Sequence, residues 1–375
     1  MRMKRSSLTY FAFSFLLILL YACISGSDSE TSYNTSSDTG TITFALSLQE
    51  APSNDADRHA AQQIDCADIK SVEGHVYDEN NKLLVSGGPW ECEAGEGTIS
   101  GVPAGENRKV VVLCKDSSDD ICHLGETIGI TVIAGQSNTA GTITLSPNYQ
   151  VFYTSDIFPA DYIDQKWDEG YSITSVAYGD GMWAVVMSQG TDFGYQGWAT
   201  RSEFSMLDDF IYLYWDEGYR ISDLAYGNGL WAVVISQGTN YTDQYWDSSD
   251  IYPEELIYYK WDEGYYITSL AYGDGTWAVV MSEGTQYTNQ GWQTSTDFPS
   301  DYINEKWAAG RYITSLIYGD RWAVVMSERT VWYTDQWWAT RYDFPSDFIY
   351  VKWAEGYSIT SLTYGDGIWA VVMSK

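Results

Sequence analysis

A pattern of hydrophobic and polar residues recurs five times along the C-terminal part of the chain. In one copy, residues 313–318 favour a pleated strand, residues 319–321 form a Gly-Asp-Arg turn, and residues 322–326 are almost entirely apolar. The other copies lie at 173–188, 221–236, 267–282 and 359–374. β-Branched and aromatic residues suit strands, and the Gly-Asp-Gly or Gly-Asn-Gly turn of the other copies supplies the positive φ of a tight reversal. Each copy therefore predicts a hairpin whose second strand is apolar enough to be buried on both faces.

Two columns of tryptophans and a short helix complete the repeated unit. The first column, in which Gly follows three residues later, contains Trp167, Trp215, Trp261, Trp307 and Trp353. In the second column each Trp follows a Gln by two residues, in the pairs Gln196–Trp198, Gln244–Trp246, Gln290–Trp292 and Gln336–Trp338. A helix is predicted before Trp307, because Pro299 and Gly310 are typical of helix boundaries and Ile303 lies one turn ahead of Trp307. Each unit is thus predicted to contain one short helix and three strands.

The two ends of the repeat region predict a closed ring. The last copy reaches Lys375 directly after the strand of Trp369, whereas Gln150-Val151-Phe152 at the start of the region matches a Gln-x-Trp strand. We therefore expect the strand near residue 150 to complete the last unit, because an open solenoid would carry polar caps instead. The predicted fold class is mainly β: a small β-sandwich at 41–147, followed by a closed five-bladed propeller-like ring at 148–375.

The N-terminus predicts export and a lipid anchor. A basic start and an apolar run form a pattern typical of a signal peptide over 1–22, too short for a comfortable membrane span. The sequence Leu20-Tyr21-Ala22-Cys23 resembles the lipobox of bacterial lipoproteins. This resemblance implies a lipid on Cys23 and, because Ile24 rather than Asp follows, the outer membrane of a bacterial cell envelope. The alternative is ordinary secretion with cleavage nearby. Residues 23–40 are rich in Ser, Thr, Asp and Gly and are predicted to be a flexible tether.

Residues 41–147 predict a second, smaller domain. Five segments are rich in strand-forming residues and separated by turn signals, namely 41–46, 72–77, 109–113, 128–132 and 140–145. Several short strands with turns between them indicate a β-sandwich. The turn Val102–Gly105 and the segment Ala134–Leu145 resemble the carboxypeptidase-regulatory-like and Ig-like modules of bacterial surface proteins.

Four of the five cysteines lie in this smaller domain. They are Cys66, Cys92, Cys114 and Cys122. An even number of cysteines in an exported domain predicts disulfides, and three pairings are possible. We favour Cys66 with Cys92 and Cys114 with Cys122, the second closing a hairpin. A zinc site that uses His75 or His123 is the alternative, but it lacks Cys-x-x-Cys spacing.

The negative charge of the chain limits the classes of molecule that it can bind. The net charge is −31, and the repeat region alone carries 32 acidic and 11 basic residues. This balance excludes nucleic acid as a partner, because phosphates need a basic surface. Like charge also keeps a surface rich in aromatic residues dispersed in solution. Calcium binding is an alternative, although the chain has no Asp-x-Asp-x-Asp-Gly loop.

The repeat region offers little catalytic chemistry. It contains no His and no Cys, which excludes imidazole-dependent nucleophiles and imidazole metal sites there. The acidic pairs Asp168-Glu169, Asp216-Glu217 and Asp262-Glu263 recur after the helix tryptophan, and paired carboxylates are the chemistry of glycosidases. However, catalysis requires two carboxyl groups in different environments, whereas these pairs repeat with the unit. We predict no enzyme activity, no cofactor and no metal.

The repeated unit also resembles a known family. The run Phe298–Leu316, followed by Trp322–Ser327, resembles a domain of unknown function that is found at the C-terminus of plant casein-kinase-like protein kinases and in bacterial secreted proteins. The resemblance covers 149–375. The kinase domain has no counterpart in this chain, so no phosphotransfer is implied.

Taken together, these patterns predict a surface-anchored, non-catalytic and multivalent binding module. Its ligand is a glycan or a protein of the envelope, and the membrane is contacted through the N-terminal lipid. The expected ligand-binding residues are the Gln-x-Trp pairs, because a repeated aromatic residue beside an amide could stack and hydrogen-bond a sugar. Packing between neighbouring units is the competing interpretation of these tryptophans. A scaffold lipoprotein of the envelope is the alternative function, and a propeller glycosidase that uses Asp168, Glu169 and Asp262 is a third.

Overall fold

The computed structural model describes residues 38–49, 66–328 and 333–375. In these ranges the protein is mainly β, with short helices between strands. The predicted signal peptide, the lipid site at Cys23 and the tether up to residue 37 lie outside the described residues and stay predictions. Within the described ranges, no helix is both long and apolar enough to cross a membrane.

The N-terminal domain forms one seven-stranded sheet rather than the two sheets of the predicted sandwich. Its strands are β1 (Thr39–Leu48), β2 (Ser71–Tyr77), β3 (Leu83–Trp90), β4 (Glu96–Pro103), β5 (Gly105–Lys115), β6 (Ile121–Val132) and β7 (Ser137–Pro147). Their order is β3-β2-β5-β6-β7-β1-β4, and the edge strands β3 and β4 contact each other, so the sheet is nearly closed and barrel-like. Register shifts in the β1–β4, β1–β7 and β5–β6 ladders explain the difference, because bulges bend strands and increase their twist.

The two predicted disulfides have different outcomes. Cys66 and Cys92 are bonded, as predicted, with their Cα atoms 5.4 Å apart. The prediction for Cys114 and Cys122 is wrong in this structure, because both are free thiols. The β5–β6 register places Cys114 opposite His123, and the Cys122 thiol donates a hydrogen bond of 3.2 Å to the backbone carbonyl of Cys114 instead.

The repeat region forms, in its described residues, five three-stranded sheets, each with one helix, as predicted. The helices are α1 (Ala160–Asp168), α2 (Asp208–Trp215), α3 (Glu254–Asp262), α4 (Ser300–Ala308) and α5 (Ser346–Ala354). The outer strands, one in each sheet, are β8 (Gln150–Ser155), β11 (Gln196–Arg201), β14 (Asp243–Ser249), β17 (Thr288–Ser295) and β20 (Gln336–Arg341). The middle strands are β10 (Met182–Ser188), β13 (Leu230–Ser236), β16 (Thr276–Glu283), β19 (Trp322–Glu328) and β22 (Ile368–Ser374). The inner strands are β9 (Ser172–Gly179), β12 (Arg220–Gly227), β15 (Tyr266–Gly273), β18 (Tyr312–Tyr318) and β21 (Ser358–Gly365).

The predicted exchange of a strand between the first and last units does not occur. β8 pairs with β10 of its own unit, and the last unit is completed by β20, which pairs with β22. The physical reason is the order of elements: each Gln-x-Trp strand precedes its helix and folds back onto the middle strand of the same unit. The first unit therefore covers 150–188 and the last 336–374.

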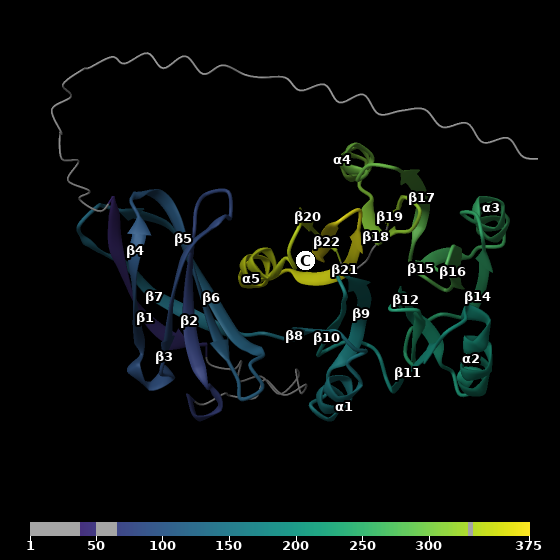
Figure 1. Cartoon of the computed structure of the whole chain (residues 1–375), viewed down its shortest axis with the longest axis horizontal. Coiled ribbons are helices and arrows are strands. Elements are labelled where there is room, and N and C mark those ends of the chain that lie inside the picture. Colours follow the sequence, from purple (N-terminus) through teal and green to yellow (C-terminus); the bar gives the residue numbers. More distant parts are fainter. Residues whose placement is uncertain (1–37, 50–65, 329–332) are drawn as a thin grey trace, which may run out of the picture. The chain divides into compact units, whose positions relative to one another are not determined.

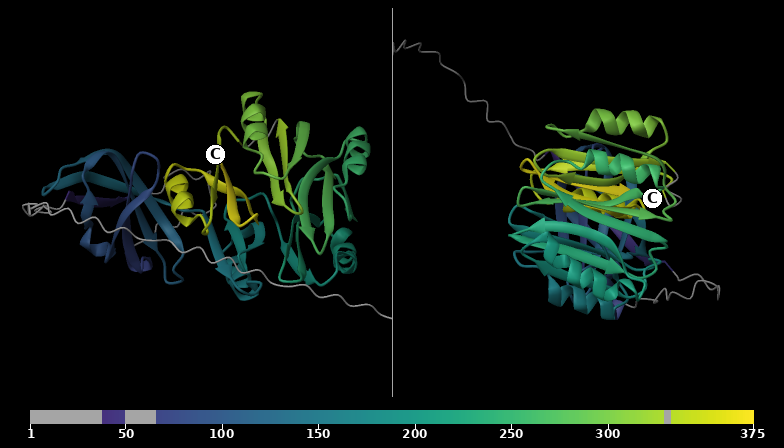
Figure 2. Two further views of the ribbon diagram at one scale, coloured as in Figure 1. Left: turned by 45° about the horizontal axis from the view of Figure 1, so that its top comes forward. Right: turned by 90° about the vertical axis from the view of Figure 1, so that its right-hand side faces the viewer.

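The first and last units nevertheless lie side by side. The inner strands contact one another in the cyclic order β9, β12, β15, β18 and β21, and β21 contacts β9. Figure 1 shows these strands around a common centre, and Figure 2 shows the helices on the outside from two other directions. The Gln150 side chain bridges the two units: its oxygen accepts hydrogen bonds from Ile359 N–H at 2.6 Å and Trp353 Nε1 at 3.0 Å. Its nitrogen donates to the Ile359 carbonyl at 3.1 Å.

The last helix packs against the N-terminal domain. Val351 and Trp353 of α5 share one buried hydrophobic cluster with Val111 and Leu113 of β5. At the edge of this contact, Lys109 on β5 forms an ion pair of 2.5 Å with Glu355. The two domains are therefore joined by an apolar core and not only by the chain between them.

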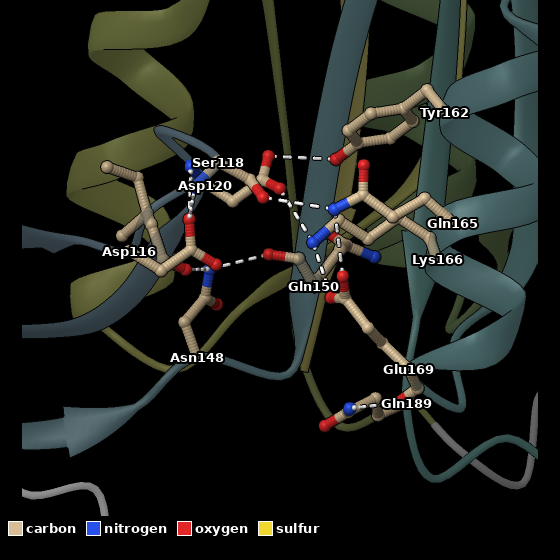
Figure 3. A network of polar contacts seen from close by, with 11 residues as sticks. Asp116, Ser118, Asp120, Asn148, Gln150, Tyr162, Gln165, Lys166, Glu169 and Gln189 are labelled. Carbon is tan, nitrogen blue, oxygen red and sulfur yellow. Dashed lines mark hydrogen bonds and ion pairs between the residues drawn. The ribbon is translucent and has the colours of Figure 1, made fainter. Parts of the chain in front are cut away.

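A polar network joins the same two domains at α1 (Figure 3). Lys166, which is almost fully buried, contacts Asp120 at 2.8 Å and Glu169 at 2.6 Å. The Tyr162 hydroxyl donates to the other oxygen of Asp120 at 2.8 Å. Burial raises the pKa of Asp120, and although burial acts to lower the pKa of Lys166, the two carboxylates outweigh it and raise that pKa. Asp116 orders the loop by accepting the backbone N–H of Asp120.

Candidate functional site

The predicted Gln-x-Trp glutamines connect neighbouring units. Gln290 accepts hydrogen bonds from Trp261 Nε1 at 3.1 Å and from Ile267 N–H at 2.7 Å, and it donates to the Ile267 carbonyl at 3.0 Å and to Ser327 at 3.0 Å. Equivalent bonds to the preceding unit are made by Gln196, Gln244 and Gln336. The amide groups are therefore already used inside the protein, one at each boundary between sheets, and are not brought together in one place.

The tryptophans of these pairs are half-buried between units. Each packs on an aromatic residue of the preceding unit, with ring centroids 4.6–5.0 Å apart, in the pairs Trp198–Phe158, Trp246–Trp215, Trp292–Tyr252 and Trp338–Phe298. This is the packing arrangement that competed with ligand binding in the sequence interpretation.

Two of the recurring carboxylates, Glu169 and Glu263, form ion pairs at the helix ends. Glu169 pairs with Lys166 at 2.6 Å, and Glu263 pairs with Lys260 at 2.7 Å. Asp262 is exposed beside the second pair. In the part of the chain that the structure describes, no group of three or more His, Cys, Asp or Glu side chains is placed to hold a metal ion. His75 and His123, the alternative zinc ligands, have pKa values lowered by burial.

A cavity that the sequence interpretation missed lies where three equivalent loops meet. Its volume is about 380 Å³. We call it the mouth pocket, and it is lined by Thr191-Asp192-Phe193, Thr239-Asn240-Tyr241, Thr285-Gln286-Tyr287, Thr174 and Tyr333, together with two loop glycines. Each loop thus places an acidic or amide side chain directly before an aromatic one. The repeated Gly-Thr-polar-aromatic sequence was the available signal, and only its convergence needed the structure.

Close backbone contacts fix these loops against each other. Gly238 has φ +77°, and a Cβ there would lie 2.3 Å from the carbonyl oxygen of Asp192. Gly284 has φ +79°, and a Cβ there would lie 3.0 Å from the carbonyl oxygen of Asn240. Only glycine accepts both the positive φ and the close approach. The sequence therefore builds a pocket of defined shape from consecutive units.

The aromatic residues of the mouth pocket stay uncharged at neutral pH. Burial raises the pKa of Tyr241 and of Tyr333 to about 12, and it raises the pKa of Tyr287 well above its ordinary value. These three phenols, with Phe193, offer apolar ring faces and neutral hydroxyl groups.

The mouth pocket adjoins a second cavity, which we call the central channel. The two cavities share Thr174 and the four aromatic residues of the mouth pocket as lining. The central channel measures about 270 Å³ and is lined by the five inner strands. Four units place a serine at the same lining position, namely Ser175, Ser269, Ser315 and Ser361, and the second unit places Asp223 there. The sequence signal was Ile-Ser-Asp-Leu at 221–224, where the other copies read Ile-Thr-Ser-Leu or Ile-Thr-Ser-Val.

Asp223 joins three strands of the channel wall. Its carboxylate accepts hydrogen bonds from Val176 N–H at 2.7 Å, from Leu224 N–H at 2.9 Å and from the Ser269 hydroxyl at 3.3 Å. Burial raises the pKa of Asp223 to about 7, and the three donors act in the opposite direction. The carboxyl group is therefore poised to exchange its proton near neutral pH.

The charges of the two cavities have one sign. Among the described residues that line them, Asp192 and Asp223 are the carboxylates, and there is no lysine, arginine or histidine. Hydroxyl groups, amides and aromatic rings make up most of the remaining lining. This arrangement can hold a polyhydroxylated or cationic ligand and repels an anionic one.

A family model described as Domain of unknown function (DUF7477) matches residues 120–228 and 221–375. The two matches cover more than half of the chain, and the first begins at Asp120, the partner of Lys166. No curated protein matches the chain at a significant level.

Proposed function

We propose a function from the geometry of the site, because the chain belongs to the family called Domain of unknown function (DUF7477), whose name assigns no activity. The protein is a non-catalytic binding module that takes a glycan in the mouth pocket. The observation that carries this proposal is the repeated pair of a polar and an aromatic side chain: Asp192-Phe193, Asn240-Tyr241 and Gln286-Tyr287. Sugars present apolar C–H faces that pack on aromatic rings, and hydroxyl groups that bond to amides and carboxylates.

In this proposal the repeats act together on one ligand. Three loops contribute equivalent groups to one cavity, whereas the Gln-x-Trp pairs are spread around the region. The architecture that presents the pocket is a closed five-bladed propeller, supported by the cyclic contacts of the inner strands and by the Gln150 bridge. A lipid on Cys23 in the outer membrane would display it on the cell envelope.

The experiment is a glycan array with the wild-type protein, followed by calorimetric titration of the best ligand. Tyr241→Ala and Tyr287→Ala should each weaken binding by about tenfold or more, since loss of one stacked ring costs about 1–3 kcal/mol. Tyr342→Ala is the matched control, because Tyr342 is 82% exposed and lies outside the pocket. Absence of any glycan ligand, or equal affinity in all three variants, would overturn the proposal.

A scaffold role is the second candidate, favoured by a likeness between α2 and α5. In α5, Tyr350 and Val351 belong to the contact with the seven-stranded sheet, and Val351 is fully buried. In α2 the same positions hold Tyr212 and Leu213, which are 62% and 67% exposed. α2 thus presents to solvent the kind of surface with which α5 binds a β-sheet.

The scaffold role is tested by co-purification from solubilised envelopes. Leu213→Glu should remove an envelope protein that co-purifies with the wild type. Glu305→Gln, at the equivalent position of α4, should retain it, because Glu305 is already a polar, exposed residue. A partner that is retained by Leu213→Glu would exclude α2 as its binding surface.

The third candidate, a propeller glycosidase, is not favoured by a comparable structural observation. Its proposed residues Asp168, Glu169 and Asp262 lie at helix ends, and Glu169 is paired with Lys166. We expect the Asp168→Asn and Asp262→Asn variants to keep full glycan binding. We also expect the wild type to release no reducing sugar from a glycan.

A further inference from the structure

We propose that the ligand of the mouth pocket carries a free amino group, as an amino sugar does, and that this ammonium group enters the central channel and pairs with Asp223. The inference rests on the proposed function, since it names the class of glycan that the same pocket takes. It follows from three properties of the channel: its charge, its aromatic entrance and its single symmetry-breaking carboxylate.

The charge of the two cavities selects a cation. Of the described lining residues, Asp192 and Asp223 are acidic and none is basic. A carboxylate in a confined channel attracts an ammonium group more strongly than it does in bulk water. Phe193, Tyr241 and Tyr287 line both cavities, and aromatic rings attract a cation that lies over their faces.

Asp223 has capacity for one more donor. A carboxylate offers about four lone-pair positions, and Val176, Leu224 and Ser269 use three of them. The residue is half-buried in the channel wall and remains in contact with the cavity. An incoming ammonium group could therefore bind without breaking the bonds that hold Asp223 in place.

The fold itself does not require a carboxyl group at this position. One unit later, Ser269 accepts a hydrogen bond from Leu224 N–H at 3.2 Å, as Asp223 does from Val176 N–H. A serine hydroxyl thus makes the same contact between sheets without the cost of a buried charge. Burial raises the pKa of Asp223 because it disfavours the charged form, and a paired cation would offset that effect.

Among the described residues that line the central channel, Asp223 is the one charged group. β9 contributes Ser175 and Tyr178 to the channel lining, and β15 contributes Ser269 and Tyr272. The middle strand β13 contributes no residue to that lining. The electrostatic response to a bound amine is therefore assigned to Asp223 among these groups.

The test compares two matched probes by calorimetry at pH 7 with the full chain. The probes are a glucosamine hexamer, which has free amino groups, and its fully N-acetylated counterpart. The wild type should bind the free-amine hexamer at least about tenfold more tightly. Asp223→Ser should reduce this preference, which is the ratio of the two affinities, to within about threefold; the tenfold preference of the wild type corresponds to about 1.4 kcal/mol.

Two further variants serve as controls for the role of the Asp223 charge. Asp223→Asn keeps the shape of the side chain and should behave as Asp223→Ser does. Asp262→Asn removes an exposed carboxylate elsewhere and should keep the full preference. Equal binding of both hexamers by the wild type, or an undiminished preference in Asp223→Ser, would overturn this inference and leave the proposed glycan site standing. Failure of every glycan to bind would overturn both.

Discussion

Tyr364 packs directly against Gly179: a Cβ built on Gly179 would lie 2.0 Å from the Cβ of Tyr364. The same relationship joins each unit to the next, in the pairs Tyr178–Gly227, Tyr226–Gly273, Tyr272–Gly319 and Tyr318–Gly365. Because the tyrosine of the last unit reaches the glycine of the first, the contact runs through all five units and returns to its start. The first glycine of each turn is thus needed for close approach. In four of the five turns positive φ falls on the two residues after it, such as Asp180 and Gly181.

Gly179→Ala should destabilise the protein by about 1–3 kcal/mol, because an added methyl group overpacks the contact with Tyr364. The matched control is Gly197→Ala, where the nearest atoms to the new Cβ lie 3.5 Å away. The free energy of unfolding from urea titration measures both. Equal stability of the two variants would contradict a tight contact between the first and last units.

The stability of the protein should fall between pH 4 and pH 7 through Asp223. The folded state raises the pKa of this carboxyl group from 3.8 to about 7, so folding favours the protonated form. The favourable contribution is complete below the unfolded pKa and is lost as the pH rises through the folded pKa. Asp223→Ser should therefore be more stable than the wild type at pH 8, by roughly 1–3 kcal/mol.

The melting temperatures of both proteins at pH 4 and pH 8 check this prediction. The difference between them should shrink toward pH 4, where the carboxyl group is protonated in the folded wild type and the pH lies close to the unfolded pKa of 3.8. A constant difference across this range would show that the substitution acts through packing and not through charge.

The thiols of Cys114 and Cys122 should not react in the folded protein. Burial raises the pKa of each to about 12, so almost no thiolate exists at pH 8. Iodoacetamide should label neither cysteine before unfolding and both after it, as read by peptide mass spectrometry. The peptides of Cys66 and Cys92 should stay linked until a reductant is added. Recovery of a linked Cys114–Cys122 peptide would restore the pairing that the sequence suggested.

Lys166→Met should destabilise the protein by about 3–5 kcal/mol, because it leaves Asp120 buried without its partner. The equivalent change in α4, Lys306→Met, should cost about 0–1 kcal/mol, because Lys306 pairs with Glu305, whose side chain is 71% exposed. Urea unfolding of both variants measures the difference. Similar losses would show that the Lys166 network adds little to the contact between domains.

The sequence by itself determined the repeated unit. The helix before Trp307, bounded by Pro299 and Gly310, and the apolar strand that follows at 322–326 are found where the periodicity places them. These features depend on residues that are close in sequence: turn residues, alternating burial and helix boundaries. The disulfide between Cys66 and Cys92 also agrees with the residue pattern, since four cysteines allow few pairings.

Only the tertiary structure decided which strand completes each sheet and which side chains line the cavities between the five units. Gln150-Val151-Phe152 resembles a Gln-x-Trp strand and was expected to complete the last unit. The strand instead pairs within its own unit, and the Gln150 side chain makes the contact with Ile359 of the last unit. The mouth pocket and Asp223 remained unseen for the same reason. Side chains from separate units meet only after the sheets pack. The solvation and protonation of a side chain such as Asp223 depend on that packing and not on spacing along the chain.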